Sequence, residues 1–170
     1  MDLRGELLHI RGKEHVLEIV TWVGTDRKRL SQLMHIFLYD DYRASQQAGC
    51  PLGDIGKNHP ELILPYLHKM IDRMLQPAVH RSVKRNVVRI LQFMDIPEKH
   101  QGNVMNVCFE LLGDPKEAIA VRVFSMTVLD NLSKIYPELR QELIAIIEDE
   151  MEREPTAAFK SRAKKILARK

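Results

Sequence analysis

The stretch PAVHRSVKRNVVRIL, residues 77–91, is followed 38 positions later by PKEAIAVRVFSMTVL, residues 115–129. Both stretches begin with a proline, carry a base seven positions on and end in an apolar pair. The corresponding residues are Pro77, Lys84, Ile90 and Leu91 in the first and Pro115, Arg122, Val128 and Leu129 in the second. A period of this length, carried by helical patterns, is typical of stacked helix pairs. The spacing therefore predicts an all-α fold.

The composition agrees with helix packing. The chain has 170 residues, of which 45% are hydrophobic and only 6% are aromatic, so aliphatic side chains must supply the core. Such a core suits helices better than a sheet. The formal net charge of +3 is too small by itself to indicate a polyanionic partner.

Prolines divide the chain into helical hairpins. Pro-Glu pairs are expected to open helices because proline is favoured in the first helical turn. These pairs begin at Pro60, Pro97 and Pro137, and they alternate with turns at Pro77, Pro115 and Pro155. The alternation predicts eight or nine helices, with loops of about two to five residues. Residues 1–12, which contain two glycines, are expected to form a frayed or loosely docked leader before a single domain over residues 13–170.

Residues 60–91 resemble one unit of the HEAT-repeat family. The landmarks are Pro60-Glu61-Leu62, Pro65, Leu67, Met70, Pro77, Val83-Lys84 and Ile90-Leu91, and a closer match is Asp114-Pro115 followed by Val121-Arg122. The resemblance implies an armadillo-like right-handed α-α superhelix, a short HEAT-like α-solenoid of about four hairpins. It also implies that Asp114 and Arg122 pair in a ladder between neighbouring units, and that Lys84 has a similar structural role.

Basic residues are concentrated on the expected second helices of the hairpins. Residues 78–94 contain four bases and no acid, and residues 156–170 contain six bases and no acid. In the family, partners usually bind the surface that the second helices form. The resemblance and the charge together suggest a partner-binding set of Arg81, Lys84, Arg85, Arg89 and Arg122.

These features favour a non-catalytic scaffold that binds an acidic segment of a protein partner. The alternative is a nucleic-acid-binding protein that uses the basic helix over residues 78–94 and the basic C-terminal helix, although the nearly neutral helix around Arg122 would interrupt a continuous groove. For the C-terminal bases, pairing with the acids of residues 138–154 is a competing, purely structural explanation. Association of the open ends into a homodimer is a further alternative.

Motifs of catalytic, metal or cofactor sites are absent from the sequence. There is no HExxH, GxGxxG, GxxxxGK[ST] or GxSxG, so neither a metal nor a cofactor is expected. Cys50 and Cys108 are isolated, and no apolar run approaches 18 residues, so we expect a cytoplasmic protein that does not enter the membrane. Some members of a HEAT-like group are DNA glycosylases. That enzymatic alternative would use an acid such as Asp41 or Asp54. Stacking on a base would need convergent aromatic side chains, whereas the chain has one tryptophan, Trp22, and its tyrosines are scattered.

Overall fold

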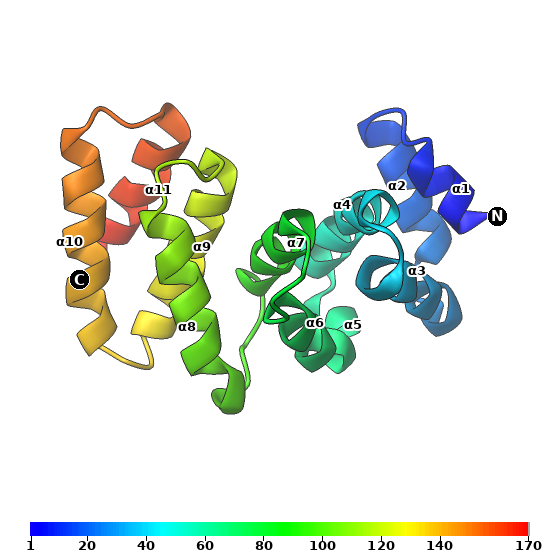
Figure 1. Ribbon diagram of the computed structural model, residues 1–170, viewed down its shortest axis with the longest axis horizontal. Coiled ribbons are helices and arrows are strands. Elements are labelled where there is room, and N and C mark those ends of the chain that lie inside the picture. Colours follow the sequence, from blue (N-terminus) through cyan, green and yellow to red (C-terminus); the bar gives the residue numbers. More distant parts are fainter. Residues whose placement is uncertain (170) are drawn as a thin grey trace. The chain divides into compact units, whose positions relative to one another are not determined.

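The computed structural model describes residues 1–169 and is helical, with no strand among those residues (Figure 1). The all-α class predicted from the 38-residue spacing is confirmed. The chain divides into two compact units, Met1–Asp95 and Ile96–Lys170, and Lys170 itself lies outside the described residues. The single domain expected over residues 13–170 stays a prediction.

In unit 1, the second helices of successive hairpins lie side by side. Its elements are α1 (Leu3–Leu8), α2 (Lys13–Val23), α3 (Arg27–Tyr39), α4 (Tyr42–Asn58), α5 (Pro60–Ile63), the 3-10 turn η1 (Leu64–Tyr66), α6 (Leu67–Met74) and α7 (Arg81–Leu91). α3 pairs with α4, and α6 pairs with α7. α4 also packs against α2 on one flank and against α7 on the other (Figure 1). A surface of three neighbouring helices, α2, α4 and α7, results.

Three glycines allow α4 and α7 to approach closely. A Cβ atom built on Gly49 would lie 2.3 Å from Cγ of Asn86, and one on Gly53 would lie 2.6 Å from Cζ of Arg89. Gly56 faces Ile90 in the same manner, at 3.2 Å. The spacing of the glycines places them on one face of the helix, and each accommodates a side chain of α7. α4 runs through Pro51 as one helix.

The first residues of the chain differ from the expected leader. Leu3–Leu8 forms a helix in which Asp2 accepts a hydrogen bond from the backbone N–H of Gly5. Its two inward-facing leucines are buried: Leu3 and Leu7. Arg4 forms an ion pair of 3.0 Å with Asp40. Apolar burial and this ion pair therefore hold a segment whose glycines suggested fraying.

Unit 2 has two hairpins around one interior helix. Its helices are α8 (Glu98–Gly113), α9 (Ile119–Ser133), α10 (Glu138–Glu152) and α11 (Ala157–Ala168). α9 packs against α8, α10 and α11, and its apolar side chains are buried on several sides. The nearly neutral helix expected around Arg122 is therefore α9, the interior helix of this unit. Pro97 and Pro137 directly precede α8 and α10, as the Pro-Glu pairs predicted.

Candidate functional site

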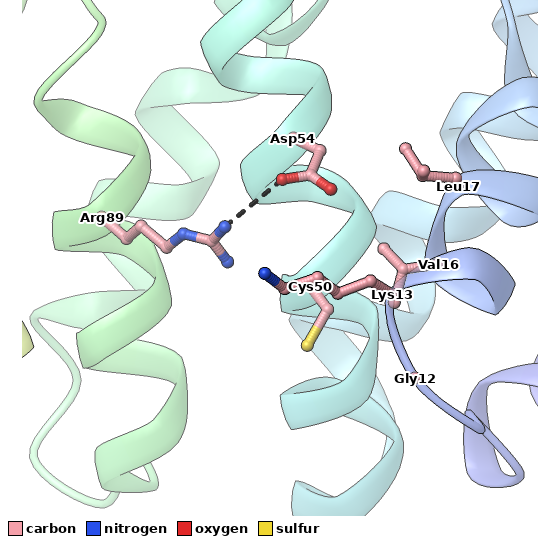
Figure 2. A pocket seen from close by; sticks show the side chains of 7 residues that line it. All are labelled: Gly12, Lys13, Val16, Leu17, Cys50, Asp54 and Arg89. Atoms are coloured by element: carbon pink, nitrogen blue, oxygen red, sulfur yellow. Dashed lines mark hydrogen bonds and ion pairs between the residues drawn. The ribbon is translucent and has the colours of Figure 1, made fainter.

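A pocket of about 570 Å³ lies on the second helices of unit 1 (Figure 2). Three helices contribute to its walls. The lining residues are Gly12, Lys13, Val16 and Leu17 at the start of α2, Cys50 and Asp54 on α4, and Arg89 on α7. Helical spacing explains the grouping, because residues three or four positions apart share a face. The pocket thus combines basic, acidic and apolar groups from three neighbouring helices.

The charged groups of the pocket leave an excess of one positive charge. Nη2 of Arg89 lies 3.4 Å from Oδ1 of Asp54, and the two side chains are 32% and 36% exposed. Lys13 extends from the opposite wall toward the same part of the pocket (Figure 2). One carboxylate therefore faces two cations, and the long Arg89–Asp54 contact is a weak, partly solvated ion pair.

The apolar part of the pocket is formed by α2. Val16 is half-buried, whereas the side chain of Leu17 is 55% exposed. An exposed leucine alone is ordinary in a folded protein. Leu17, however, lies beside a pocket that also contains two cations, so a ligand there would meet an apolar wall and a charged wall together.

Cys50 is the thiol of the pocket. Burial raises the pKa of this half-buried thiol, and Asp54 raises it further, while Arg89 lowers it. Burial raises the pKa of the second thiol, Cys108, to about 12. Because a thiolate rather than a thiol is the nucleophile, neither environment activates its cysteine.

α7 brings four of the predicted partner-binding residues onto one helix. Arg81 is exposed at its start, Lys84 and Arg85 are half-buried, and Arg89 contributes to the pocket. His80 accepts a hydrogen bond from the backbone N–H of Ser82 and so caps the helix. The four bases predicted to share one helix therefore lie on α7. Arg89, near the C-terminal end of α7, lines the pocket.

A family model described as a HEAT repeat domain matches residues 3–170. The chain belongs to the HEAT repeat family. The HEAT-like α-solenoid suggested by the resemblance is thereby confirmed. No curated protein and no solved structure matches the chain. HEAT repeats generally act as protein-interaction scaffold modules, and the family is typically non-catalytic.

Arg122 has a structural role in unit 2, with Glu150 as its acidic partner where Asp114 was expected. Its side chain is 5% exposed, donates to the backbone carbonyl of Leu112 at 2.9 Å and pairs with Glu150 at 3.1 Å. The predicted ladder partner, Asp114, accepts a hydrogen bond from the backbone N–H of Lys116. Arg122 is therefore part of the packing between α8, α9 and α10. Its contact with a partner stays a prediction, and the interior position of α9 leaves only 5% of the side chain exposed.

The basic C-terminal helix uses part of its charge internally. Arg162 donates to the hydroxyl of Thr127, and Nη2 of Arg169 lies 2.6 Å from Oδ1 of Asp130. The remaining described bases of this segment are exposed: Lys160, Lys164 and Lys165. Lys170, which also belongs to the predicted basic segment, lies outside the described residues. The charge available to an external polyanion is accordingly smaller than the sequence suggested.

The residues named for a glycosylase have structural contacts in this HEAT repeat protein. Asp41 caps α4 by accepting from the backbone N–H of Arg43 at 2.9 Å, and Asp54 pairs with Arg89. Trp22 is half-buried, with the guanidinium of Arg29 4.6 Å from its ring centroid. Within residues 1–169, no group of three or more His, Cys, Asp or Glu side chains is arranged to hold a metal ion.

No helix formed by residues 1–169 combines the length and the apolar character needed to cross a bilayer.

Sequence reasoning missed the α2 side of the pocket. Lys13 and Leu17 were not predicted as site residues, because nothing in the order of residues shows that α2 lies beside α4. The glycine spacing on α4 was the one available signal: Gly49, Gly53 and Gly56 indicate a face that another helix approaches closely. That signal predicts a helix contact, but it does not identify the side chain that enters it.

Proposed function

We propose that this HEAT repeat protein is a non-catalytic interaction scaffold whose unit 1 binds an acidic segment of a protein partner across α2, α4 and α7. The observation that carries the proposal is the pocket in which Lys13 and Arg89 extend toward the same space with Asp54 as the acid of the lining. An anionic group would relieve the repulsion between the two cations.

The charge of the three second helices supports the same conclusion. Together α2, α4 and α7 carry seven bases and three acids. Four of the bases are on α7, which contains no acid. Complementary charge of this kind speeds association with an acidic partner and contributes to specificity.

A charge-reversal experiment tests the proposal. The probe is a short fluorescein-labelled peptide of Glu and Ser, and its binding is followed by fluorescence anisotropy at low salt. The paired variant Lys84→Glu/Arg89→Glu should lose binding. The matched control Lys28→Glu/Lys69→Glu changes two exposed bases on α3 and α6, the first helices, and the net charge by the same amount. Equal loss in both variants would show only a general charge effect and would overturn the site assignment.

Nucleic-acid binding is the second candidate, and it is favoured by the same basic helix. Phosphates would interact with the bases of α7, helped by Lys160, Lys164 and Lys165 of α11. The internal contacts of Arg162 and Arg169 argue against it, because those two bases are already engaged. Retention of duplex DNA that falls steeply with salt would distinguish this function from peptide binding.

A further inference from the structure

We propose that the pocket among α2, α4 and α7 takes the free C-terminal carboxylate of a partner chain whose last residue is apolar. Lys13 and Arg89 would hold the carboxylate, and Val16 and Leu17 would contact the side chain of that residue. The proposal depends on the proposed function of the same surface and narrows it from an acidic segment to the end of one.

The charge of the pocket fits one carboxylate. Two cations and one acid leave a single positive charge, which one carboxylate neutralises. The guanidinium is planar and donates two parallel hydrogen bonds to a carboxylate, whereas a lysine ammonium acts as a compact point charge. Arg89 and Lys13 therefore form a complementary pair around one anionic group.

Gly53 determines where the Arg89 guanidinium lies. A Cβ atom at residue 53 would come within 2.6 Å of both Cζ and Nη1 of Arg89. The guanidinium thus packs directly on the backbone of α4, beside Asp54, where it can face a ligand in the pocket. A side chain already held in position loses less entropy when it binds a ligand.

The closeness of the apolar wall favours a chain end over an internal acid. In an extended segment, consecutive side chains point to opposite faces, so an internal Glu and its apolar neighbour do not enter the same pocket. The last residue of a chain carries its side chain and its carboxylate on one Cα. The volume of about 570 Å³ is within the usual range for pockets that bind small ligands. It suits one or two residues at a chain end.

A comparison of three peptides distinguishes binding of a free C-terminal carboxylate from binding of an acidic segment in general. Three fluorescein-labelled peptides of Glu and Ser are compared by anisotropy: one ends in Leu with a free carboxylate, one is its C-terminal amide, and one has Leu inside and Ser at the end. The free Leu terminus should bind about tenfold or more tightly than the amide, as expected when charge-assisted hydrogen bonds are lost. The peptide with internal Leu should bind as weakly as the amide.

Variants of the full chain test the residue roles. Arg89→Gln and Lys13→Gln should each remove the preference for the free carboxylate, while Lys69→Gln, on α6, should leave it unchanged. Asp54→Asn should tighten binding of the free terminus, because it removes the carboxylate that competes for Arg89 and keeps the shape of the side chain. A merely structural role of the Asp54–Arg89 pair would instead make Asp54→Asn as damaging as Arg89→Gln, and that result would overturn the inference.

The thiol of Cys50 gives an independent readout of occupancy. Cys50 lines the pocket, whereas Cys108 is fully buried. The free-carboxylate peptide should slow modification of Cys50 by a thiol reagent, and the amide should not. Equal binding of the free acid and the amide would overturn the carboxylate pocket and leave the acidic-segment function standing. Failure of all three peptides to bind would overturn both the carboxylate pocket and the acidic-segment function.

Discussion

Arg89 and Arg122 lie on second helices of this HEAT repeat protein, and both were predicted to contact a partner. The side chain of Arg89 is 32% exposed and reaches a pocket, whereas that of Arg122 is 5% exposed and pairs with Glu150. The difference is set by the neighbours of each helix. α9 is covered by three other helices, so an arginine on its inner face becomes part of the core.

Arg122 is expected to contribute to stability. Arg122→Ala would leave Glu150, whose side chain is 15% exposed, with only the long contact of 4.0 Å to the exposed Arg153 as an ion pair. Loss of one member of such a pair costs about 3 kcal/mol of unfolding free energy, and the apolar Arg122→Met should cost less because it keeps the packing. Urea unfolding followed by circular dichroism measures both values. A loss for Arg122→Ala below about 1 kcal/mol would contradict the role of the pair.

Cys50 should be a slow nucleophile whose reactivity depends on its two charged neighbours. Its pKa lies above the ordinary value of 9.0 because the thiol is partly buried, so the rate of reaction with a thiol reagent should still be rising as the pH passes 9. Asp54→Asn should lower the pKa and speed the reaction at pH 8, whereas Arg89→Gln should raise it and slow the reaction. Stopped-flow absorbance with a disulfide reagent measures the rates.

The matched control for the thiol experiment is Cys50→Ser. Since Cys108 is fully buried and its pKa is raised to about 12, the native Cys50→Ser protein should react hardly at all. Opposite changes for the two charge variants are the decisive result. If both variants shifted the rate in the same direction, a change of structure and not of charge would be responsible.

At the scale of elements, the glycine-rich stretch of α4 is a packing surface for α7. Gly49, Gly53 and Gly56 each accommodate a side chain of α7, and together they bring the two helices close. Glycine and proline reduce helix propensity, so this stretch by itself would form only a weak helix. The helix persists because tertiary packing outweighs that local preference.

Gly53→Ala should weaken peptide binding without lowering the stability of the fold. The added methyl group would meet the end of the Arg89 side chain, which can move, so the displacement costs little energy. Alanine is favoured over glycine in a helix by about 0.5–1 kcal/mol, and the free energy of unfolding should stay unchanged or rise. Binding of the carboxylate peptide should fall because the guanidinium is displaced. Unfolding curves and peptide anisotropy measure the two effects.

Gly102→Ala is the control for helix propensity. Gly102 lies in α8, and a Cβ atom there would meet nothing within 4 Å. The substitution should raise stability by a similar amount and leave peptide binding unchanged. If Gly53→Ala kept full peptide affinity, the guanidinium position would not matter for binding, contrary to our expectation.

At the scale of the whole molecule, the distribution of charge matters more than the net value of +3. In unit 1, α7 carries four bases and no acid, and one of them, Arg89, lines a pocket. In unit 2, two bases at the C-terminal end, Arg162 and Arg169, are engaged within the fold. These two bases of unit 2 are therefore less available to an external anion than the exposed Lys160, Lys164 and Lys165.

We expect duplex DNA to bind only at low salt. If the four bases of α7 contacted phosphates, the logarithm of the binding constant would fall with that of the salt concentration at a slope of about −3.6. Filter binding of a short duplex over a salt series measures this slope. Tight binding at physiological salt with such a slope, and its loss in Lys84→Glu/Arg89→Glu, would favour nucleic-acid binding over the peptide-binding scaffold.

The order of residues alone determined the fold class. The 38-residue spacing and the Pro-Glu helix starts predicted helical hairpins, because proline placement and apolar periodicity act locally along the chain. The residues also showed the basic character of α7. They predicted a frayed start where the structure has α1, since the burial of its leucines depends on helices that follow later in the chain.

Only the tertiary structure decided which of the basic residues line the pocket of unit 1. Helix packing buried Arg122 in unit 2 and placed Lys13 of α2 opposite Arg89 of α7 across Cys50 and Asp54. These residues are far apart in the sequence, and no local pattern specifies that they meet. Periodicity tells which face of a helix is apolar, but the side chains that share a pocket depend on which helices become neighbours and how closely small residues let them approach.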